Sequence, residues 1–312
     1  MKVLHLEENH PALIEGLRVL GIQNDLAYDD SLDEVLAKLD QYDGLIIRSK
    51  YPIDETFLTC AKKLKFIGRV GAGLENIDIP AVESRNIHLL NAPEGNRNAV
   101  GEHALAMLLA LMNKLRVGHT SIQSGQWDRE GHRGWELSGR TVGIIGYGNT
   151  GKSFAKRISG FNVRTLCYDI LENVGDEYAQ QVNWETLISQ SEVISLHIPK
   201  TDLTRGLIDK KFIDSMAHAF WLLNTGRGSA VVTKDLVTGL KSKKIIGAGL
   251  DVLEYETRSF SSIFNQENLP PALQYLMEAK NVLLSPHVAG WTQESHVKLA
   301  TTVVDKIKEL FF

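Results

Sequence analysis

The chain has 312 residues, of which 43% are hydrophobic and 23% are charged, and its formal net charge is −4. Because a domain holds roughly 100–200 residues, this length favours two domains, and the apolar fraction excludes an intrinsically disordered chain. Basic residues do not gather in any run, so we expect no nucleic acid and no anionic membrane as the main partner.

The cysteines and the longest apolar run exclude further classes. Cys60 and Cys167 lie far apart without a CxxC pattern, which argues against a disulfide framework and a structural zinc cluster. The apolar run 104–112 has about half the length of a membrane span. Acidic residues near the start occupy positions where a signal peptide would be apolar. We therefore expect a cytoplasmic globular protein that holds no metal.

Aliphatic runs alternate with stretches of helical apolar spacing along the whole chain. Near-continuous apolar strands between helices are typical of parallel sheets with helices on both faces, so the fold class is α/β with doubly wound sheets. The predicted strands cover residues 2–6, 44–47, 66–70, 88–90, 141–146, 163–168, 193–197, 220–224, 245–250 and 282–284.

Two arginines and a Gly-rich turn lie at the ends of the early strands. Arg48 follows the second predicted strand and Arg69 lies near the end of the third. A phosphate group favours two or more cations, so both are candidates for binding one; the alternative is an ordinary surface ion pair. The backbone of Val70, Gly71 and Ala72 is a candidate to present N–H groups to a substrate carboxylate.

A break between two units falls at residues 91–100. Asn, Pro, Gly and Glu precede a long helical pattern from Val100 to about Val117, and a polar connector with Trp127 and Trp135 follows it. Asn96, next to the break, is a candidate polar contact for substrate. We predict one domain over 1–98 and 288–312 and a second over 99–287, because the tail is too short to be a domain of its own.

The segment TVGIIGYGNTG (141–151) contains a glycine pattern between a strand and a helix. Gly146, Gly148 and Gly151 satisfy GxGxxG, with Asn149 and Thr150 inside the turn. In a dinucleotide-binding turn the three glycines make the tight turn, admit the pyrophosphate and let helix pack on strand. The helix N-terminus then offers unpaired N–H groups to the phosphates. The alternative is a plain tight turn.

An acidic residue stands where an adenosine ribose would be bound. Asp169 ends the next strand, 18 residues after Gly151. A carboxylate there accepts hydrogen bonds from the ribose hydroxyls and repels a 2′-phosphate, which favours NAD over NADP. His197 follows a later strand of the same domain, and we expect it to border the cofactor rather than do chemistry.

Polar residues follow three further strands. Thr225 and Arg227 lie in LLNTGRGSAVV (222–232) and His287 in VLLSPHVAG (282–290). Ligands bind outside the carboxyl ends of parallel strands, so these side chains are expected near one another. A guanidinium suits a substrate carboxylate, and a histidine can take a hydroxyl proton. Taken singly, Arg227 could also be an ordinary surface charge, and His287 could be a structural histidine.

The intervening segment GAGLDVLEYE (247–256) supplies the acidic residues. Asp251, Glu254 and Glu256 follow its strand. A carboxylate beside a histidine fixes the ring and stabilises its charged form. The pattern leaves open whether Glu254 or Glu256 does so, and a solvated loop residue is the alternative for either.

Seven segments spread over nearly the whole chain resemble the D-isomer-specific 2-hydroxyacid dehydrogenase family, most closely its D-3-phosphoglycerate dehydrogenase branch. They are GRVGAGLENID (68–78), NAPEGN (91–96), LSGRTVGIIGYGNTG (137–151), SLHIPKT (195–201), NTGRGSAVV (224–232), GLDVLEYE (249–256) and SPHVAGWTQES (285–295). The resemblance implies a Rossmann NAD-binding domain inserted in a flavodoxin-like substrate domain.

The resemblance also implies a role for each site residue. Arg227 binds the substrate carboxylate, His287 is the acid/base and Glu256, rather than Glu254, pairs with it. Asp251 is expected to hold the nicotinamide carboxamide. Arginines in the segments of Arg48 and Arg69 lie by the substrate phosphate in the phosphoglycerate branch.

The sequence departs from the family pattern after the catalytic glutamate. Thr257 stands where proline is usual, and the stretch 258–280 is longer than expected. Nothing resembles the regulatory domain that some phosphoglycerate dehydrogenases carry, so we expect a short form without it.

We expect an NAD-dependent enzyme that oxidises D-3-phosphoglycerate to 3-phosphohydroxypyruvate in serine biosynthesis. The alternative within the family is a reductase of glyoxylate, hydroxypyruvate or another 2-keto acid. A remote alternative is an NAD(H)-sensing, corepressor-like binding protein. The apolar helix after residue 100 and the Trp-bearing connector resemble the family's dimer interface, so we expect a homodimer; packing within one chain is the alternative.

Overall fold

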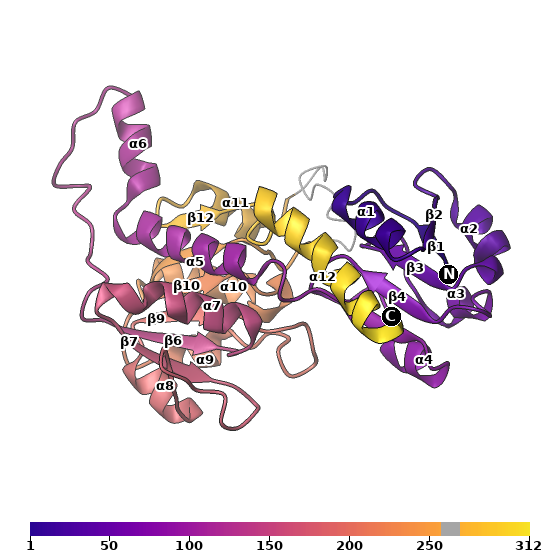
Figure 1. The fold of residues 1–312 in the computed structure, drawn as a ribbon. Helices are drawn as coiled ribbons and strands as arrows, with labels where there is room; N and C mark the ends of the chain where they lie inside the picture. The colour runs from indigo at the N-terminus through magenta and orange to yellow at the C-terminus, as the bar shows by residue number, and fades with distance from the viewer. Residues whose placement is uncertain (257–268) are drawn as a thin grey trace. The chain divides into compact units, whose positions relative to one another are not determined.

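Figure 1 shows the computed structural model of the chain, which describes residues 1–256 and 269–312. The described residues form two compact units. Unit 1 contains Met1–Arg97 and Trp291–Phe312, and unit 2 contains Asn98–Gly290. These boundaries lie one and three residues from the expected ones. Thr257 and the first part of the long stretch after it lie outside the described residues.

Unit 1 is built on a parallel sheet with strand order β2-β1-β3-β4-β5, which is the flavodoxin-like order. Its strands are β1 (Lys2–His5), β2 (Gln23–Leu26), β3 (Gly44–Ile47), β4 (Phe66–Arg69) and β5 (His88–Asn91). Its helices are α1 (Ala12–Val19), α2 (Leu32–Lys38), α3 (Glu55–Thr59), α4 (Ile79–Ser84) and α12 (Gln293–Phe311), with a 3₁₀ turn η1 (Leu39–Gln41). The C-terminal helix α12 packs on α1, β4 and β5 (Figure 1).

Both faces of this sheet are covered by apolar side chains. Successive side chains of a strand point to opposite faces. Accordingly, Leu45 and Ile47 of β3 join one core cluster, whereas Ile46 joins the cluster formed with α1 and α12. Burial on both faces explains why β3 is apolar throughout.

Strand β2 has no counterpart among the predicted strands. Its four residues read Gln-Asn-Asp-Leu and none is buried, although they pair in parallel register with β1. It lies at the edge of the sheet, where polar side chains are tolerated and the apolar signal is absent.

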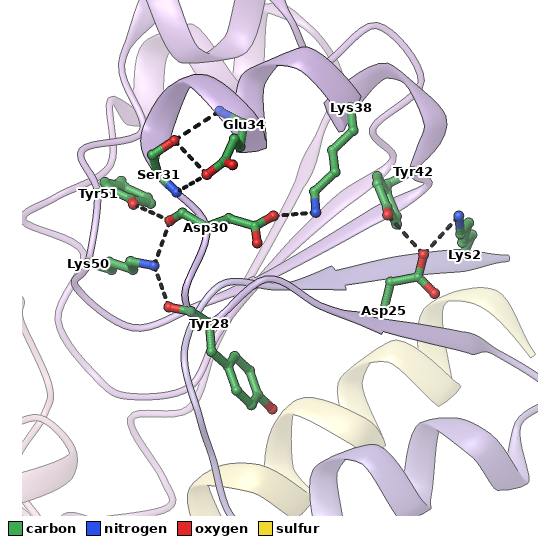
Figure 2. Close-up of polar contacts among 10 residues, drawn as sticks. All are labelled: Lys2, Asp25, Tyr28, Asp30, Ser31, Glu34, Lys38, Tyr42, Lys50 and Tyr51. Carbon is green, nitrogen blue, oxygen red and sulfur yellow. Dashed lines mark hydrogen bonds and ion pairs between the residues drawn. The ribbon is translucent and has the colours of Figure 1, made fainter.

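The loop after β2 is tied to the segment after β3 by the polar contacts of Figure 2. Lys50 Nζ donates hydrogen bonds to the carbonyl oxygens of Tyr28 (2.6 Å) and Asp30 (3.0 Å), and Tyr51 Oη donates to the same Asp30 carbonyl (2.8 Å). The Asp30 carboxylate pairs with Lys38 of α2. These contacts hold the segment that directly follows Arg48.

Unit 2 is built on a second parallel sheet, with strand order β12-β11-β10-β9-β6-β7-β8. Its strands are β6 (Thr141–Ile145), β7 (Arg164–Tyr168), β8 (Gln180–Gln181), β9 (Val193–Leu196), β10 (Phe220–Asn224), β11 (Ile245–Leu250) and β12 (Val282–Leu284). Starting from β6, this is the Rossmann order with one added strand, β12. Both expected sheet architectures are thus confirmed.

The helices of unit 2 cover both faces of its sheet. They are α5 (Arg97–Met112), α6 (Leu115–Gln123), α7 (Asn149–Ile158), α8 (Trp184–Gln190), α9 (Lys210–Ser215), α10 (Thr233–Lys241) and α11 (Pro271–Glu278), with 3₁₀ turns η2 (Ser159–Phe161) and η3 (Gly228–Ala230). Ile144 of β6 packs in the cluster containing α5 residues, and Ile145 packs in the cluster on the other face.

The single long helix expected from Val100 to Val117 is wrong. The chain breaks after Met112, where Lys114 takes a left-handed conformation with φ +52°, and α6 continues to Gln123. Apolar spacing alone did not reveal the break because Lys114 interrupts neither the composition nor the period.

None of the helices described in residues 1–256 and 269–312 combines the length and apolar character needed to span a membrane.

Candidate active site

The glycine turn between β6 and α7 has the geometry that close packing demands. Gly146 has φ +88°, and a Cβ there would lie 2.5 Å from the carbonyl oxygen of His197. A Cβ on Gly151 would lie 2.2 Å from the carbonyl oxygen of Gly146. Both positions therefore require glycine for internal reasons.

Gly148 differs from the other two glycines because its requirement is not internal. A Cβ there would meet no atom within 4 Å. It precedes α7, and among the described residues no side chain caps the first N–H groups of that helix. An open backbone at an uncapped helix N-terminus fits a bound pyrophosphate. Asn149 and Thr150 form the start of this helix.

Asp169 connects the end of β7 to the glycine turn. Its Oδ2 accepts a hydrogen bond from Tyr147 N (2.7 Å) and its Oδ1 accepts one from Leu171 N (3.0 Å). A carboxylate has about four lone-pair sites, so these two bonds leave capacity for ribose hydroxyls.

His197 contacts the same glycine turn through Thr150. It is 8% exposed, its Nε2 lies 2.8 Å from Ser195 Oγ and its Nδ1 lies 3.3 Å from Thr150 Oγ1. Burial lowers the pKa of His197 to about 3, so the ring is neutral at ordinary pH. Its geometry suits positioning of the Thr150 hydroxyl rather than proton transfer.

The carboxyl ends of three adjacent strands, β10, β11 and β12, carry the polar segments of unit 2. The buried Asn224 shapes the first of them: its Nδ2 donates to Arg227 O (3.0 Å) and its Oδ1 accepts from Gly226 N (3.1 Å). A Cβ on Gly228 would lie 1.9 Å from Leu253 O, so this loop packs directly on the one after β11. Arg227 is half-buried, and Nη1 donates to Gly226 O (2.8 Å).

Asp251 organises the turn that carries His287. Its carboxylate accepts hydrogen bonds from Ser285 Oγ (2.6 Å), Val288 N (2.9 Å) and Ala289 N (2.8 Å), and His287 N donates to its carbonyl oxygen (2.8 Å). With 1% of Asp251 exposed, these donors account for its burial. The expected contact with a nicotinamide carboxamide stays a prediction.

His287 and Glu256 form the central pair. His287 Nδ1 lies 2.8 Å from Glu256 Oε2, and both side chains are partly exposed. Glu256 Oε1 in turn accepts a hydrogen bond from Leu253 N (2.5 Å). Since the carboxylate accepts the Nδ1 proton, Nε2 is the ring nitrogen left to face a reacting group.

Glu254 serves another purpose. Its Oε2 accepts a hydrogen bond from Thr233 N (2.8 Å), the first residue of α10. Of the two glutamates that the sequence left open, the structure therefore pairs Glu256 with His287.

Two buried polar atoms, one in each unit, fit contacts to a bound molecule. Thr225 Oγ1 and Asn96 Oδ1 are buried, and neither has a hydrogen-bond partner among the residues that the structure describes. Buried polar atoms are normally paired, so each marks a place where a ligand or water would bind. Both are candidate site residues, for cofactor and substrate respectively.

Two N–H groups of the Gly-rich turn after β4 already have backbone partners. Val70 N already donates to Ile47 O (2.9 Å), and Gly71 N donates to Arg69 O (2.9 Å). A carboxylate cannot use Val70 N–H without breaking the sheet ladder, and can use Gly71 N–H only after a local turn. Ala72 O accepts from Asn91 Nδ2 (2.7 Å), which anchors the far side of this loop.

The two arginines of unit 1 lie in different settings. A Cβ on Gly71 would lie 1.5 Å from Arg69 Nη1, so the Arg69 guanidinium covers the Gly71 backbone. The Arg48 guanidinium lies over the Trp291 ring, 4.4 Å from its centroid.

Several contacts at these sites carried no signal in the sequence. His103 Nε2 lies 3.0 Å from Ser285 Oγ and so supports the Asp251 network from α5. Glu7 accepts hydrogen bonds from the backbone N–H groups of Arg48 (2.5 Å) and Ser49 (2.8 Å). These contacts bridge 182, 41 and 42 positions of the chain, and no local pattern predicts them.

No three His, Cys, Asp or Glu side chains gather as a metal site would require anywhere in residues 1–256 and 269–312.

The chain matches a known protein family over more than half of its length. The model for the D-isomer specific 2-hydroxyacid dehydrogenase NAD binding domain matches residues 105–289, which is more than half of the chain. The chain belongs to the D-isomer-specific 2-hydroxyacid dehydrogenase family. The resemblance found in its sequence is confirmed, and the glycine turn and Asp169 lie within this NAD-binding domain.

Relatives from this family carry more than one activity in their names. The chain is 34% identical to a D-3-phosphoglycerate dehydrogenase of Archaeoglobus fulgidus, over 98% of this chain and 56% of the relative. It thus spans about half the length of that relative. It is 32% identical to a hydroxypyruvate reductase of Thermotoga maritima, over 89% of this chain and 88% of the relative.

A solved structure agrees with the fold. The Treponema pallidum protein TP0037, described as a D-lactate dehydrogenase, is 25% identical and superposes with a TM-score of 0.84 over 99% of this chain and 96% of its own.

Proposed function

We propose that the chain is an NAD-dependent dehydrogenase of D-2-hydroxy acids, with D-3-phosphoglycerate and 3-phosphohydroxypyruvate as its leading substrate pair. The observation that carries the proposal is the 2.8 Å contact between His287 Nδ1 and Glu256 Oε2, at the carboxyl edge of a sheet whose glycine turn fits a dinucleotide. If the substrate is phosphoglycerate, the reaction is the oxidative step of serine biosynthesis.

The cofactor would be held by the glycine turn and its neighbours. Gly146, Gly148 and Gly151 shape the turn, and the first N–H groups of α7 meet the pyrophosphate. The Asp169 carboxylate accepts hydrogen bonds from the ribose hydroxyls. It would repel a 2′-phosphate, which favours NAD over NADP. Thr225, Asp251 and His197 complete the set as contacts or supports. Bound NAD supplies the acceptor for the hydride that leaves C2 of the substrate.

Side chains of unit 2 transfer the proton of the C2 hydroxyl and bind the carboxylate of the substrate. His287 Nε2 takes the proton of the C2 hydroxyl as the C–H bond breaks, and gives it back in the reverse direction. Glu256 fixes the ring by accepting the Nδ1 proton and stabilises the imidazolium that forms. Arg227 binds the substrate carboxylate and polarises the C2 oxygen.

Unit 1 supplies the groups proposed for substrate choice. Arg48 and Arg69 are two cations on its sheet edge, which suits a phosphorylated acid. The Gly71–Ala72 backbone and Asn96 are the proposed polar contacts for the rest of the substrate. The 32% identity to a hydroxypyruvate reductase over 88% of that protein supports an unphosphorylated 2-keto acid as the second candidate.

The proposed assembly is a homodimer in the cytoplasm. None of the residues of α6, which is described throughout, is buried, and Leu115, Ile122 and Trp127 expose apolar surface on and after it. In Figure 1 this helix stands away from the sheet of unit 2. Burial of such a surface against a second copy is the proposed reason for its apolar side chains.

A parallel assay of NADH formation or loss tests the substrate. It compares D-3-phosphoglycerate with NAD, and phosphohydroxypyruvate, hydroxypyruvate and glyoxylate with NADH, each repeated with Arg48→Ala. We expect the phosphorylated pair to be preferred, and the variant to lower its kcat/KM by about ten-fold or more while sparing glyoxylate. Equal or faster turnover of the unphosphorylated acids, indifferent to Arg48, would identify a general 2-keto acid reductase.

A further inference from the structure

We propose that unit 1 contains a proton-linked phosphate subsite in which Arg48 and His10 bind the phosphate of the substrate and His296 takes up a proton when it binds. Trp291 positions the Arg48 guanidinium within it. The subsite rests on the proposed function, since it gives the phosphorylated substrate its binding partners.

Arg48 is held in a geometry that suits an oxyanion. Glu7 fixes its backbone by accepting hydrogen bonds from the N–H groups of Arg48 and Ser49. The guanidinium carbon lies 4.4 Å from the centroid of the Trp291 ring. A guanidinium that lies over an aromatic ring keeps its N–H groups available to donate hydrogen bonds to an oxyanion.

Two histidines lie beside this stack on the same unit. The His296 ring is 5.2 Å from the Trp291 ring and 5.3 Å, edge to face, from the His10 ring. His10 comes from the loop after β1, Arg48 from the end of β3 and His296 from the first turns of α12. Three chain segments thus bring Arg48 and two imidazoles to one place at the carboxyl edge of a parallel sheet, where ligands of doubly wound folds bind.

The hydrogen bonds distinguish the two histidines. Ala12 N donates to His10 Nδ1 (3.2 Å), so that nitrogen carries no proton and Nε2–H is the donor that His10 offers. Protonation of His10 would break this bond. His296 is therefore the ring that gains a proton beside a bound anion.

The surroundings of His296 disfavour its charged form. Burial lowers the pKa of His296, the positive charge of Arg48 lowers it further, and Glu8 opposes both. The Glu7 carboxylate already binds backbone N–H groups, and Tyr28 is an uncharged phenol near Glu8 whose pKa is raised by burial. Lys50 does not belong to the phosphate subsite, because its ammonium donates hydrogen bonds to the carbonyl oxygens of Tyr28 and Asp30 (Figure 2).

The sign of the linkage follows from these charges. A bound phosphate dianion favours the charged imidazolium, so the pKa of His296 rises on binding and a proton is taken up between its free and bound pKa values. Affinity for a phosphorylated acid then falls as pH rises through this window. An acid without phosphate shows no such dependence at this subsite.

Isothermal titration calorimetry of D-3-phosphoglycerate into the NADH-loaded protein measures the proton directly, because no hydride transfer is possible in that complex. Titrations in two buffers of different ionisation enthalpy, at pH about 7.5, give the protons taken up per ligand. D-glycerate is the matched ligand without the phosphate. We expect proton uptake with D-3-phosphoglycerate and none with D-glycerate.

Variants separate the roles of the residues. His296→Gln should abolish proton uptake and weaken phosphoglycerate binding by about ten-fold to a hundred-fold, whereas His296→Lys should restore affinity without proton uptake. His10→Gln should keep the uptake and weaken binding. His88→Gln, at an exposed histidine of β5 in the same unit, is the control and should match the wild type in both.

The outcomes distinguish this subsite from the proposed function. If D-3-phosphoglycerate is oxidised but His296→Gln changes neither its affinity nor its proton uptake, the subsite is wrong and the proposed function stands. If uptake is lost in His10→Gln instead, the assignment of the proton to His296 is overturned. If D-3-phosphoglycerate neither binds nor reacts while D-glycerate does, the phosphorylated substrate is wrong and the subsite falls with it.

Discussion

At the scale of single residues, the site depends on side chains that are held by backbone groups. Asp251 closes the 285–289 turn with three hydrogen bonds, and this turn places His287 in a left-handed conformation with φ +56°. Such a conformation is unfavourable for a non-glycine residue and persists where the surrounding structure enforces it. The strain is located at the residue proposed to move the proton.

The first prediction separates the two glutamates of the GLDVLEYE segment. Glu256→Gln should lower kcat by about 10²–10⁴-fold, because the imidazolium of His287 loses its carboxylate partner. Glu254→Gln is the matched control: it loses a contact to Thr233 N at the start of α10 and should cost at most about 1 kcal/mol of stability with kcat retained. A large loss of kcat in Glu254→Gln with normal turnover in Glu256→Gln would reverse the assignment.

The second prediction concerns alkaline stability. Burial raises the pKa of the Cys167 thiol from 9.0 to about 12. The folded state therefore keeps its proton where the unfolded state loses it, and the free energy of unfolding should fall as pH rises from about 9 towards 12, by up to about 1.4 kcal/mol per pH unit for this group.

Urea unfolding at a series of alkaline pH values measures this slope. Cys167→Ala should remove its share of the pH dependence, whereas Cys60→Ala should keep the wild-type slope. Parallel pH profiles for Cys167→Ala and the wild type would show that the thiol does not titrate on unfolding.

At the scale of elements, the junction of β6 and α7 contains two glycines that packing requires and one that it does not. Gly146 and Gly151 would clash with backbone atoms if they carried a Cβ, and Gly148 would not. Packing thus explains two glycines of the pattern, and the third is the one proposed to face the cofactor.

The third prediction uses this difference. Gly148→Ala should leave the melting temperature within error of the wild type and yet weaken NADH binding by about ten-fold or more, because the new methyl group faces the pyrophosphate. Gly160→Ala is the control, since a Cβ there also meets no atom within 4 Å, and it should change neither quantity. Wild-type NADH affinity in Gly148→Ala would argue against the proposed cofactor position.

The elements also show what the sequence could and could not predict. Strands such as β3 and β10 are buried along their whole length, so they could be predicted from their apolar runs. The edge strand β2 carries polar residues and was missed, and the break at Lys114 follows from one backbone conformation that composition does not encode. The motif residues Glu256 and His287 were predicted as a pair, whereas the Arg48–Trp291 stack joins positions 243 residues apart.

At the scale of the whole molecule, unit 2 exposes apolar side chains on α6 and its connector. Ile122 is 55% exposed and Trp127 is 81% exposed. Single exposed apolar residues are common, but a group on one protruding helix is typical of an association surface.

The fourth prediction is that this surface forms the dimer. Sedimentation velocity should show a dimer for the wild type and a shift to monomer for Ile122→Glu, with an unchanged circular dichroism spectrum, because a carboxylate would be buried unpaired in the interface. Leu203→Glu is the control at another strongly exposed apolar residue of unit 2, 74% exposed, and should remain dimeric. A wild-type monomer would refute the assembly.

The most direct test of the proposed active site is NADH formation from NAD and D-3-phosphoglycerate by the wild type and by His287→Gln, with the NADH affinity of both measured by fluorescence. We expect NADH formation by the wild type. For His287→Gln we expect equal NADH affinity and a rate about 10²–10⁴-fold lower, because the hydroxyl proton loses its acceptor. Wild-type rates in His287→Gln, or no NADH from any D-2-hydroxy acid, would contradict the assignment of this site.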